Sequence, residues 1–193
     1  MAFVFGSGQL LGEHTGSTPH PTWDDSMEHA CRSFLALAEI GIKHVLGGHG
    51  EGRDALILST VFTWRHYIEL RLKLLVVADD SLHSRPRREL KGHRLNYWWK
   101  IARAAITATF PDEDHATHLP AVDLHVEELD RLDPGAVSFR YTIEKDGSSA
   151  LQPGLAGFDW DVFAGLVDEV STTLEGAAAM FAGAVEHAVN NPG

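Results

Sequence analysis

The chain has 193 residues, 44% of them hydrophobic, which is enough for one domain with a sizeable core. Its single cysteine, Cys31, excludes an intrachain disulfide and favours a reducing compartment. The net charge of −11 argues against general affinity for nucleic acid. The charge is uneven, however, because residues 53–103 carry 11 basic and 5 acidic side chains. That basic centre leaves room for a local anion or RNA site.

The first 21 residues are rich in Gly, Ser, Thr, Pro and His and show no periodicity, which predicts an irregular N-terminal arm over residues 1–21. The chain start has neither the basic stretch nor the apolar stretch of a signal peptide. The most apolar segment, residues 55–78, carries five charged or ionisable side chains, so we expect no membrane span. Together these features predict a cytoplasmic protein.

Two long helices are predicted next in the chain. Thr22 is a suitable N-cap, and the apolar residues that follow it recur at helical spacing until the glycine-rich stretch at residues 47–50. A second helix of about 24 residues opens at Asp54 and ends near Asp79. It is apolar on nearly all sides, which is typical of a central buried helix.

Three further helices and a change of period follow. Helices are predicted over residues 93–110, 120–133 and from Asp159 to near the C-terminus, each with an apolar stripe. Between the last two, apolar and polar residues alternate from Val137 to Glu144, which predicts a strand and a small β-hairpin near residues 136–151. The fold class is therefore mainly α: a single domain over residues 22–190, built as a four- to five-helix bundle with that hairpin attached.

The second helix carries the first candidate site. Arg65, Glu69 and Lys73 are spaced by four and stack on one face, and His66 precedes Glu69 by three. One interpretation is an ion-pair ladder that merely solvates or clips the helix. The other is a polar site inside the bundle, with His66 as a ligand or proton carrier, because the helix is otherwise too apolar to face water broadly.

The second candidate is the basic segment over residues 85–94. It places Arg87 and Arg88 close to His93 at a helix start, a combination suited to phosphate binding with acid–base chemistry near neutral pH. Downstream, three aromatic residues could stack on bases: Tyr97, Trp98 and Trp99. The alternative is a solvated loop with its aromatic residues in the core.

A third, weaker candidate is the stretch from Asp112 to His118, read as a loop, where two aspartates and two histidines stand close together. Such side chains can hold a divalent metal, although hydrated charges that cap the next helix explain them as well. We therefore predict no metal ligands and no cofactor, and keep a metal-dependent bundle enzyme using His66 and Glu69 as the weakest alternative.

The order of these motifs resembles bacterial HEPN-like helical proteins over residues 25–188. The resemblance rests on the run from Arg65 to Lys73, on the run from Gly92 to Trp98, and on Asp133 with the segment around Arg140 before a closing amphipathic helix. It implies a helical bundle that usually forms a homodimer. The candidate binding residues Arg65, His66, Glu69, Lys73 and Arg140 all belong to these family-like stretches.

Many HEPN-like proteins are metal-independent endoribonucleases of toxin–antitoxin, CRISPR or phage-defence systems, and others bind nucleotides or protein partners without catalysis. The nuclease signature pairs an arginine with a histidine four to six residues on, which here selects Arg87 or Arg88 with His93. Pro86 and Gly92 flank this segment and predict a loop where a nuclease has a helix. The sequence therefore favours a dimeric module that binds nucleotide, RNA or a partner protein, with the endoribonuclease as the alternative.

Overall fold

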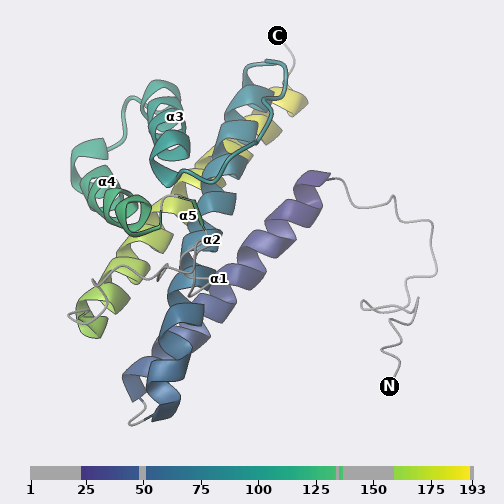
Figure 1. Ribbon diagram of the computed structural model, residues 1–193. Helices are drawn as coiled ribbons and strands as arrows, with labels where there is room; N and C mark the ends of the chain where they lie inside the picture. Colours follow the sequence, from purple (N-terminus) through teal and green to yellow (C-terminus); the bar gives the residue numbers. More distant parts are fainter. Residues whose placement is uncertain (1–22, 48–50, 134, 137–158, 192–193) are drawn as a thin grey trace, which may run out of the picture.

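The computed structural model describes residues 23–47, 51–133, 135–136 and 159–191. This part of the chain forms five α-helices (Figure 1). They are α1 (Trp23–Gly47), α2 (Glu51–Leu82), α3 (Leu95–Thr109), α4 (His115–Leu132) and α5 (Trp160–Asn190). The prediction of a mainly helical bundle is confirmed. The predicted N-terminal arm and β-hairpin lie outside the described residues.

The central helix is α2, as its apolar sequence predicts. It packs against α1, α3 and α5, while α4 covers α3 and α5 (Figure 1). Large side chains of α2 are fully buried, among them Trp64, Tyr67, Ile68 and Leu72. A helix surrounded in this way has no broad solvated face. Polar side chains in the middle of α2 must therefore find their hydrogen-bond partners inside the protein or where α2 meets its neighbouring helices.

The outer helices bury the stripes that their sequences predict. On α3 the buried side chains include Leu95, Trp98, Ala102 and Ile106, which recur every three or four residues. The corresponding stripe on α5 is Phe163, Val167, Val170, Leu174, Ala177 and Phe181. Asp159 caps α5 by accepting hydrogen bonds from the backbone N–H groups of Asp161 and Val162, as its position before the stripe predicts.

The fourth helix begins earlier than the sequence indicates. Its predicted start at Pro120 is wrong, because α4 begins at His115 and Pro120 lies inside it. The true N-cap is Asp114, whose carboxylate accepts from the N–H of Thr117 at 3.2 Å. A proline commonly lies in the first turn of a helix, so the sequence indicates Pro120 as the helix start in place of the N-cap Asp114. The stretch read as a possible metal-binding loop is therefore in part a helix terminus.

None of the helices in the described part of the chain combines the length and apolarity needed to cross a bilayer.

One polar contact in the core joins α2 to α4. The indole N–H of Trp64 donates to Nε2 of His125 at 2.6 Å, and both side chains are buried. Burial lowers the pKa of His125 from 6.5 to about 4, because the charged imidazolium would lose its hydration there. The neutral ring is thus the acceptor that Trp64 requires.

This contact predicts a specific acid sensitivity. Between pH 6.5 and about 4 the unfolded chain binds a proton at His125 that the folded chain does not, so stability falls as the pH falls. We expect His125→Gln, which does not titrate, to lose less stability over this range than the wild type in urea denaturation. The matched control is His29→Gln, which removes an exposed imidazole in place of a buried one. Equal slopes for His125→Gln and the wild type would contradict the assignment.

Candidate functional site

The charged ladder on α2 lies inside the protein. Arg65 and Glu69 are each 1% exposed and Lys73 is 6% exposed. The Glu69 carboxylate accepts from Nη1 of Arg65 at 3.3 Å and from Nζ of Lys73 at 2.7 Å. Lys73 Nζ also lies 5.4 Å from the centre of the Trp98 ring, where a cation is favoured. The ladder is therefore a buried network, which a solvated face would not explain.

Arg65 ties this network to two other parts of the chain. Its Nη2 donates to the backbone carbonyl of His93 at 2.7 Å, and its Nε donates to the carbonyl of Asp133 at 3.1 Å. His93 belongs to the connection between α2 and α3, and Asp133 follows α4. One buried guanidinium thus joins α2, the α2–α3 connection and the end of α4.

His93 places an imidazole at the edge of the same network. Its Nδ1 lies 2.9 Å from Oε1 of Glu69, and its side chain is 56% exposed. Burial raises the pKa of Glu69, but hydrogen bonds and charges from Lys73 and His93 outweigh burial, and the pKa stays below its ordinary value. The ionised carboxylate can only accept, so Nδ1 carries the proton. This leaves Nε2 of the exposed ring for acid–base chemistry.

The start of α3 is fixed beside His93. Asp130 of α4 is 1% exposed, and its Oδ1 accepts from the backbone N–H of Leu95 at 2.8 Å. Its Oδ2 accepts from Nε and Nη2 of Arg94 at 3.2 and 3.1 Å. Asp130 thus serves as the N-terminal cap that the sequence around Arg94 lacks. Reading α3 alone could not find it, since the capping residue lies 35 positions away.

The arginines of the predicted nuclease signature bind other carboxylates. Arg87 Nη1 donates to Asp24 of α1 at 3.3 Å, and Arg88 Nη2 lies 3.1 Å from Asp80 of α2. His93, in contrast, contacts Glu69. The segment over residues 85–94 is not helical, as Pro86 and Gly92 predict, and Gly92 has a φ of +90° that favours glycine. The structure therefore does not bring the signature's side chains together on one carboxylate or one helix.

The remaining predicted binding residues lie elsewhere. His66 packs its ring against Phe34 and Phe62, with ring centres 4.4 and 5.9 Å apart, so it contacts α1 and its own helix. Arg140 lies outside the described residues. Within the described ranges, no three His, Cys, Asp or Glu side chains are grouped as a metal site requires.

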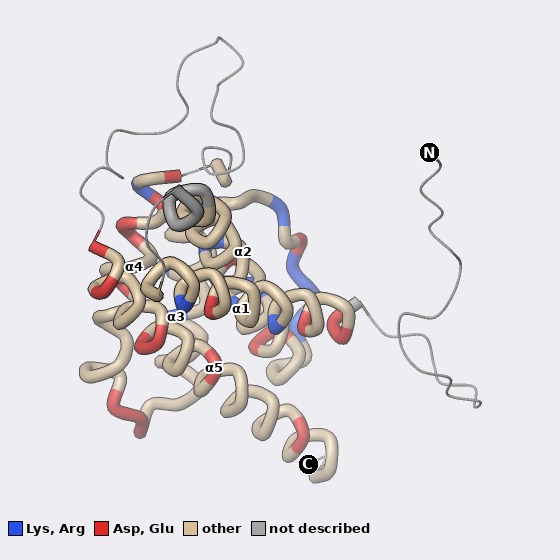
Figure 2. The backbone as a smooth tube through the Cα atoms, turned by 90° about the horizontal axis from the view of Figure 1, so that it is seen from below, with Lys and Arg blue, Asp and Glu red and all other residues tan. Residues whose placement is uncertain are grey.

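A cationic groove runs beside the α2–α3 connection. It has a volume of about 670 Å³, and alanines of α3 form much of its apolar lining. Its polar lining consists of Asp79, His83, Arg85, Arg88, Tyr97, Lys100 and Thr109. Figure 2 shows basic positions strung along the connection that follows α2.

The arginines of the cationic groove are already paired. Arg85 donates to the buried Asp79 carboxylate and also lies 3.5 Å from Asp80, which in turn pairs with Arg88. Lys100 is exposed and forms no ion pair with the described residues. Tyr97 is 58% exposed on the same helix, three residues before Lys100. The cationic groove is therefore lined by an exposed cation and an exposed aromatic ring, with the guanidinium groups of Arg85 and Arg88 beside them.

Sequence reasoning anticipated only part of this groove. It named Arg88 and the three consecutive aromatic residues, of which Trp98 and Trp99 are buried and only Tyr97 is exposed. It did not identify Lys100 or His83 as site residues. The spacing of Tyr97 and Lys100 opposite the buried stripe of α3 is the signal that could have found the lysine.

Comparison with family models, curated proteins and solved structures found no match for this chain. The resemblance to HEPN-like proteins stays a prediction.

The buried network predicts a large effect of a small change. Glu69→Gln keeps the side-chain shape but leaves Lys73 buried without its carboxylate and leaves Arg65 only Asp133, whose carboxylate lies 3.6 Å from Nε, so we expect a loss of about 3 kcal/mol at neutral pH. Because the pKa of Glu69 is lowered on folding, its contribution is present above its ordinary value of 4.5 and is lost as the pH falls through the lower native value. The difference between variant and wild type in urea denaturation should therefore shrink in acid.

The exposed Glu127 of α4 is the matched control, and Glu127→Gln should change stability by less than about 0.5 kcal/mol. If Glu69→Gln were equally mild, Glu69 would not be the charge that balances Arg65 and Lys73.

Proposed function

We propose that this protein is a HEPN-like helical module that binds the phosphate and base of a nucleotide or single-stranded RNA in the cationic groove. The observation that carries the proposal is the exposed pair of Tyr97 and Lys100 beside Arg85 and Arg88. An aromatic ring offers a stacking surface to any base, and the cations attract the phosphate. The acidic remainder of the chain restricts nucleic-acid contact to this face.

The two arginines act in this proposal as positioned donors. Asp79 and Asp80 are 4% and 2% exposed and hold the guanidinium groups of Arg85 and Arg88 at the groove. These carboxylates offset much of the arginine charge, so Lys100 supplies the charge that is not balanced locally. A groove of this kind suits one or two nucleotides better than a long duplex, whose recognition needs an extended basic surface.

The homodimer belongs to the same proposal. Leu37 and Ile40 of α1 are 57% and 63% exposed and stand three residues apart on one helix face. Apolar side chains placed in this way suit a contact with a second copy or with a partner protein. Leu37 and Ile40 do not line the cationic groove, so a dimer formed through them would leave that groove open in both copies.

RNA binding is tested with a short fluorescein-labelled single-stranded RNA, followed by fluorescence anisotropy at about 50 mM salt. Tyr97→Ala should weaken binding by about 1–3 kcal/mol through the loss of stacking. Lys100→Ala should weaken it and reduce the slope of log K against log salt by about one.

Lys43 of α1 is the matched control, because it is exposed and lies outside the lining of the cationic groove. Lys43→Ala should leave affinity within about twofold of the wild type. Equal weakening by Lys43→Ala and Lys100→Ala would indicate diffuse attraction and contradict the groove. ATP is titrated as the nucleotide ligand in the same buffer. If neither the RNA nor ATP bound at low salt, the proposal of nucleotide or RNA binding would be wrong.

A second function, metal-independent RNA cleavage, is favoured by one separate observation. His93 is oriented by Glu69 through Nδ1 and exposes its ring, as a general acid or base requires. Arg94 follows it in the chain with a side chain that is 65% exposed and held by Asp130. In this function, His93 moves protons at the 2′-hydroxyl or the leaving oxygen, and Arg94 rather than Arg88 is the arginine next to the imidazole along the chain.

Cleavage is tested with a mixed RNA pool in EDTA. His93→Ala should lower any cleavage rate by about 10²–10⁴-fold, whereas His44→Ala, a change at an exposed histidine of α1, should not. If the wild type leaves RNA as intact as His93→Ala does, the nuclease is wrong and the binding function stands unaffected.

A further inference from the structure

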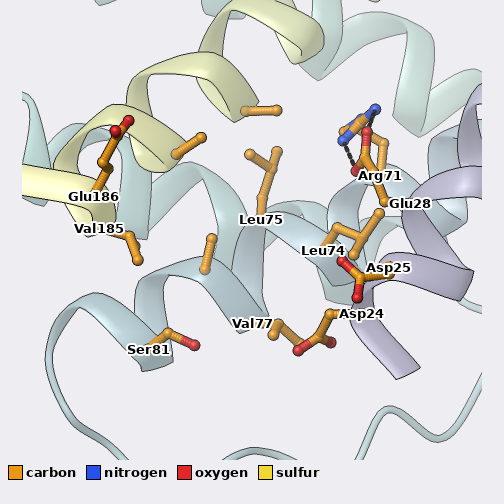
Figure 3. Close-up of a pocket in the computed structure, with 13 residues that line it drawn as sticks. Asp24, Asp25, Glu28, Arg71, Leu74, Leu75, Val77, Ser81, Val185 and Glu186 are labelled. Atoms are coloured by element: carbon orange, nitrogen blue, oxygen red, sulfur yellow. Dashed lines mark hydrogen bonds and ion pairs between the residues drawn. The ribbon is translucent and has the colours of Figure 1, made fainter. Parts of the chain in front are cut away.

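A second groove lies on the other side of α2, between α1 and α5. It has a volume of about 500 Å³ and is drawn in Figure 3. Its apolar lining comes from α2 and α5: Leu74, Leu75, Val77, Ala78, Ala178, Ala182 and Val185. Small side chains on α5 keep it open along the α2 surface. We call it the acidic groove because of the residues at its edges.

The inner end of the acidic groove is closed to anions. Arg71 is 2% exposed and makes a bidentate pair with Glu28, with distances of 2.7 and 3.0 Å. Its Nε and Nη2 also donate to Glu175, each at 2.9 Å, and the Tyr67 hydroxyl donates to the same carboxylate at 2.8 Å. These bonds use four of the five N–H donors of Arg71, and two carboxylates offset its charge. The groove has no cation left to attract a phosphate or carboxylate.

Acidic side chains stand on both walls of the groove. On the α1 side these are Asp24, Asp25 and Glu28, and on the α5 side Glu186 (Figure 3). Asp24 accepts from the guanidinium of Arg87 at the rim, and Glu28 also pairs with Arg32 of its own helix, so basic side chains of this chain already lie along the α1 wall. Glu186 is exposed and forms no ion pair with the described residues. An apolar floor between two acidic walls therefore runs along the molecule.

We propose that the acidic groove binds a basic amphipathic helix of a partner protein. Such a helix has an apolar stripe flanked on both sides by Lys or Arg, which matches an apolar floor flanked on both sides by carboxylates. The floor follows α2 from Arg71 to Ser81, about 15 Å at 1.5 Å per residue, so it accommodates about three turns.

The walls select this occupant over others. A small amine has one cation and would engage one wall only, whereas a helix with basic residues on both flanks reaches both walls. A second copy of this chain carries a net charge of −11, and its approach to an acidic groove is repelled. This interaction is independent of the cationic groove, because the two sites share no lining residue.

The test uses synthetic peptides of about 14 residues, titrated into the full chain by calorimetry. The first peptide places Leu on one helix face and Lys on both flanks. A second has the same composition in an order that spreads Leu around the helix, and a third replaces each Lys with Glu. We expect the first to bind at least about tenfold more tightly than the second, and the third not to bind.

Matched variants on α5 locate the binding. Ala182 and Ala179 are both exposed, but only Ala182 lines the acidic groove. Ala182→Arg should raise the dissociation constant about tenfold or more, because it adds bulk and positive charge to the floor, and Ala179→Arg should change it by less than about twofold. For the charge alone, Glu186→Gln should weaken binding by about threefold, and Glu169→Gln, outside the groove, should not.

Several results would overturn the proposal. Equal weakening by Ala182→Arg and Ala179→Arg would mean that the peptide adsorbs to the acidic surface in general. Equal binding of the Lys and Glu peptides would remove the role of the walls. If dodecylammonium bound with sensitivity to Ala182→Arg while the peptide did not bind, the site would be one for small amines. If Ala182→Arg converted a dimer to a monomer in sedimentation velocity, the occupant would be a second copy.

Discussion

The burial of three charges spaced four residues apart on the central helix is the constraint that organises this protein. Arg65, Glu69 and Lys73 could not lie beneath other helices without one another, since an unpaired charge in the interior costs several kcal/mol. Their mutual pairing leaves donors on Arg65, and these bind the carbonyls of His93 and Asp133. The need to satisfy one guanidinium therefore fixes how the α2–α3 connection and the end of α4 meet α2.

That anchor also determines the arrangement of the residues around the cationic groove. With His93 held at one end and Arg85 and Arg88 paired to Asp79 and Asp80 at the other, the connection lies along α2 without being helical. It forms one wall of the cationic groove, and α3 supplies Tyr97 and Lys100 on the opposite side. Ion pairs that contribute to packing thus also hold the donors that a phosphate would contact.

Features that depend on local periodicity could be predicted from the sequence, whereas ion pairs and hydrogen bonds between distant residues could not. The helix count, the burial of α2 and the Asp159 cap follow from apolar spacing and a cap residue next to its helix. Closeness in sequence does not decide which side chains pair, since Arg88 and His93 of the arginine–histidine signature contact different carboxylates of α2. The cap of α3 by Asp130 and the closure of Arg71 by Glu175 involve separations of 35 and 104 residues, which no local pattern encodes.

The pairing of its arginines decides what this chain can bind. Arg71 shares its donors between two carboxylates and cannot attract an anion, although it is buried at the end of an open groove. Arg85 and Arg88 are more exposed, with side chains 43% and 36% exposed, and each can offer remaining donors to a ligand. Lys100 and Glu186, one at each groove, have no such partner among the described residues. The unmatched lysine thus favours an anion at one groove, and the unmatched glutamate favours a cation at the other.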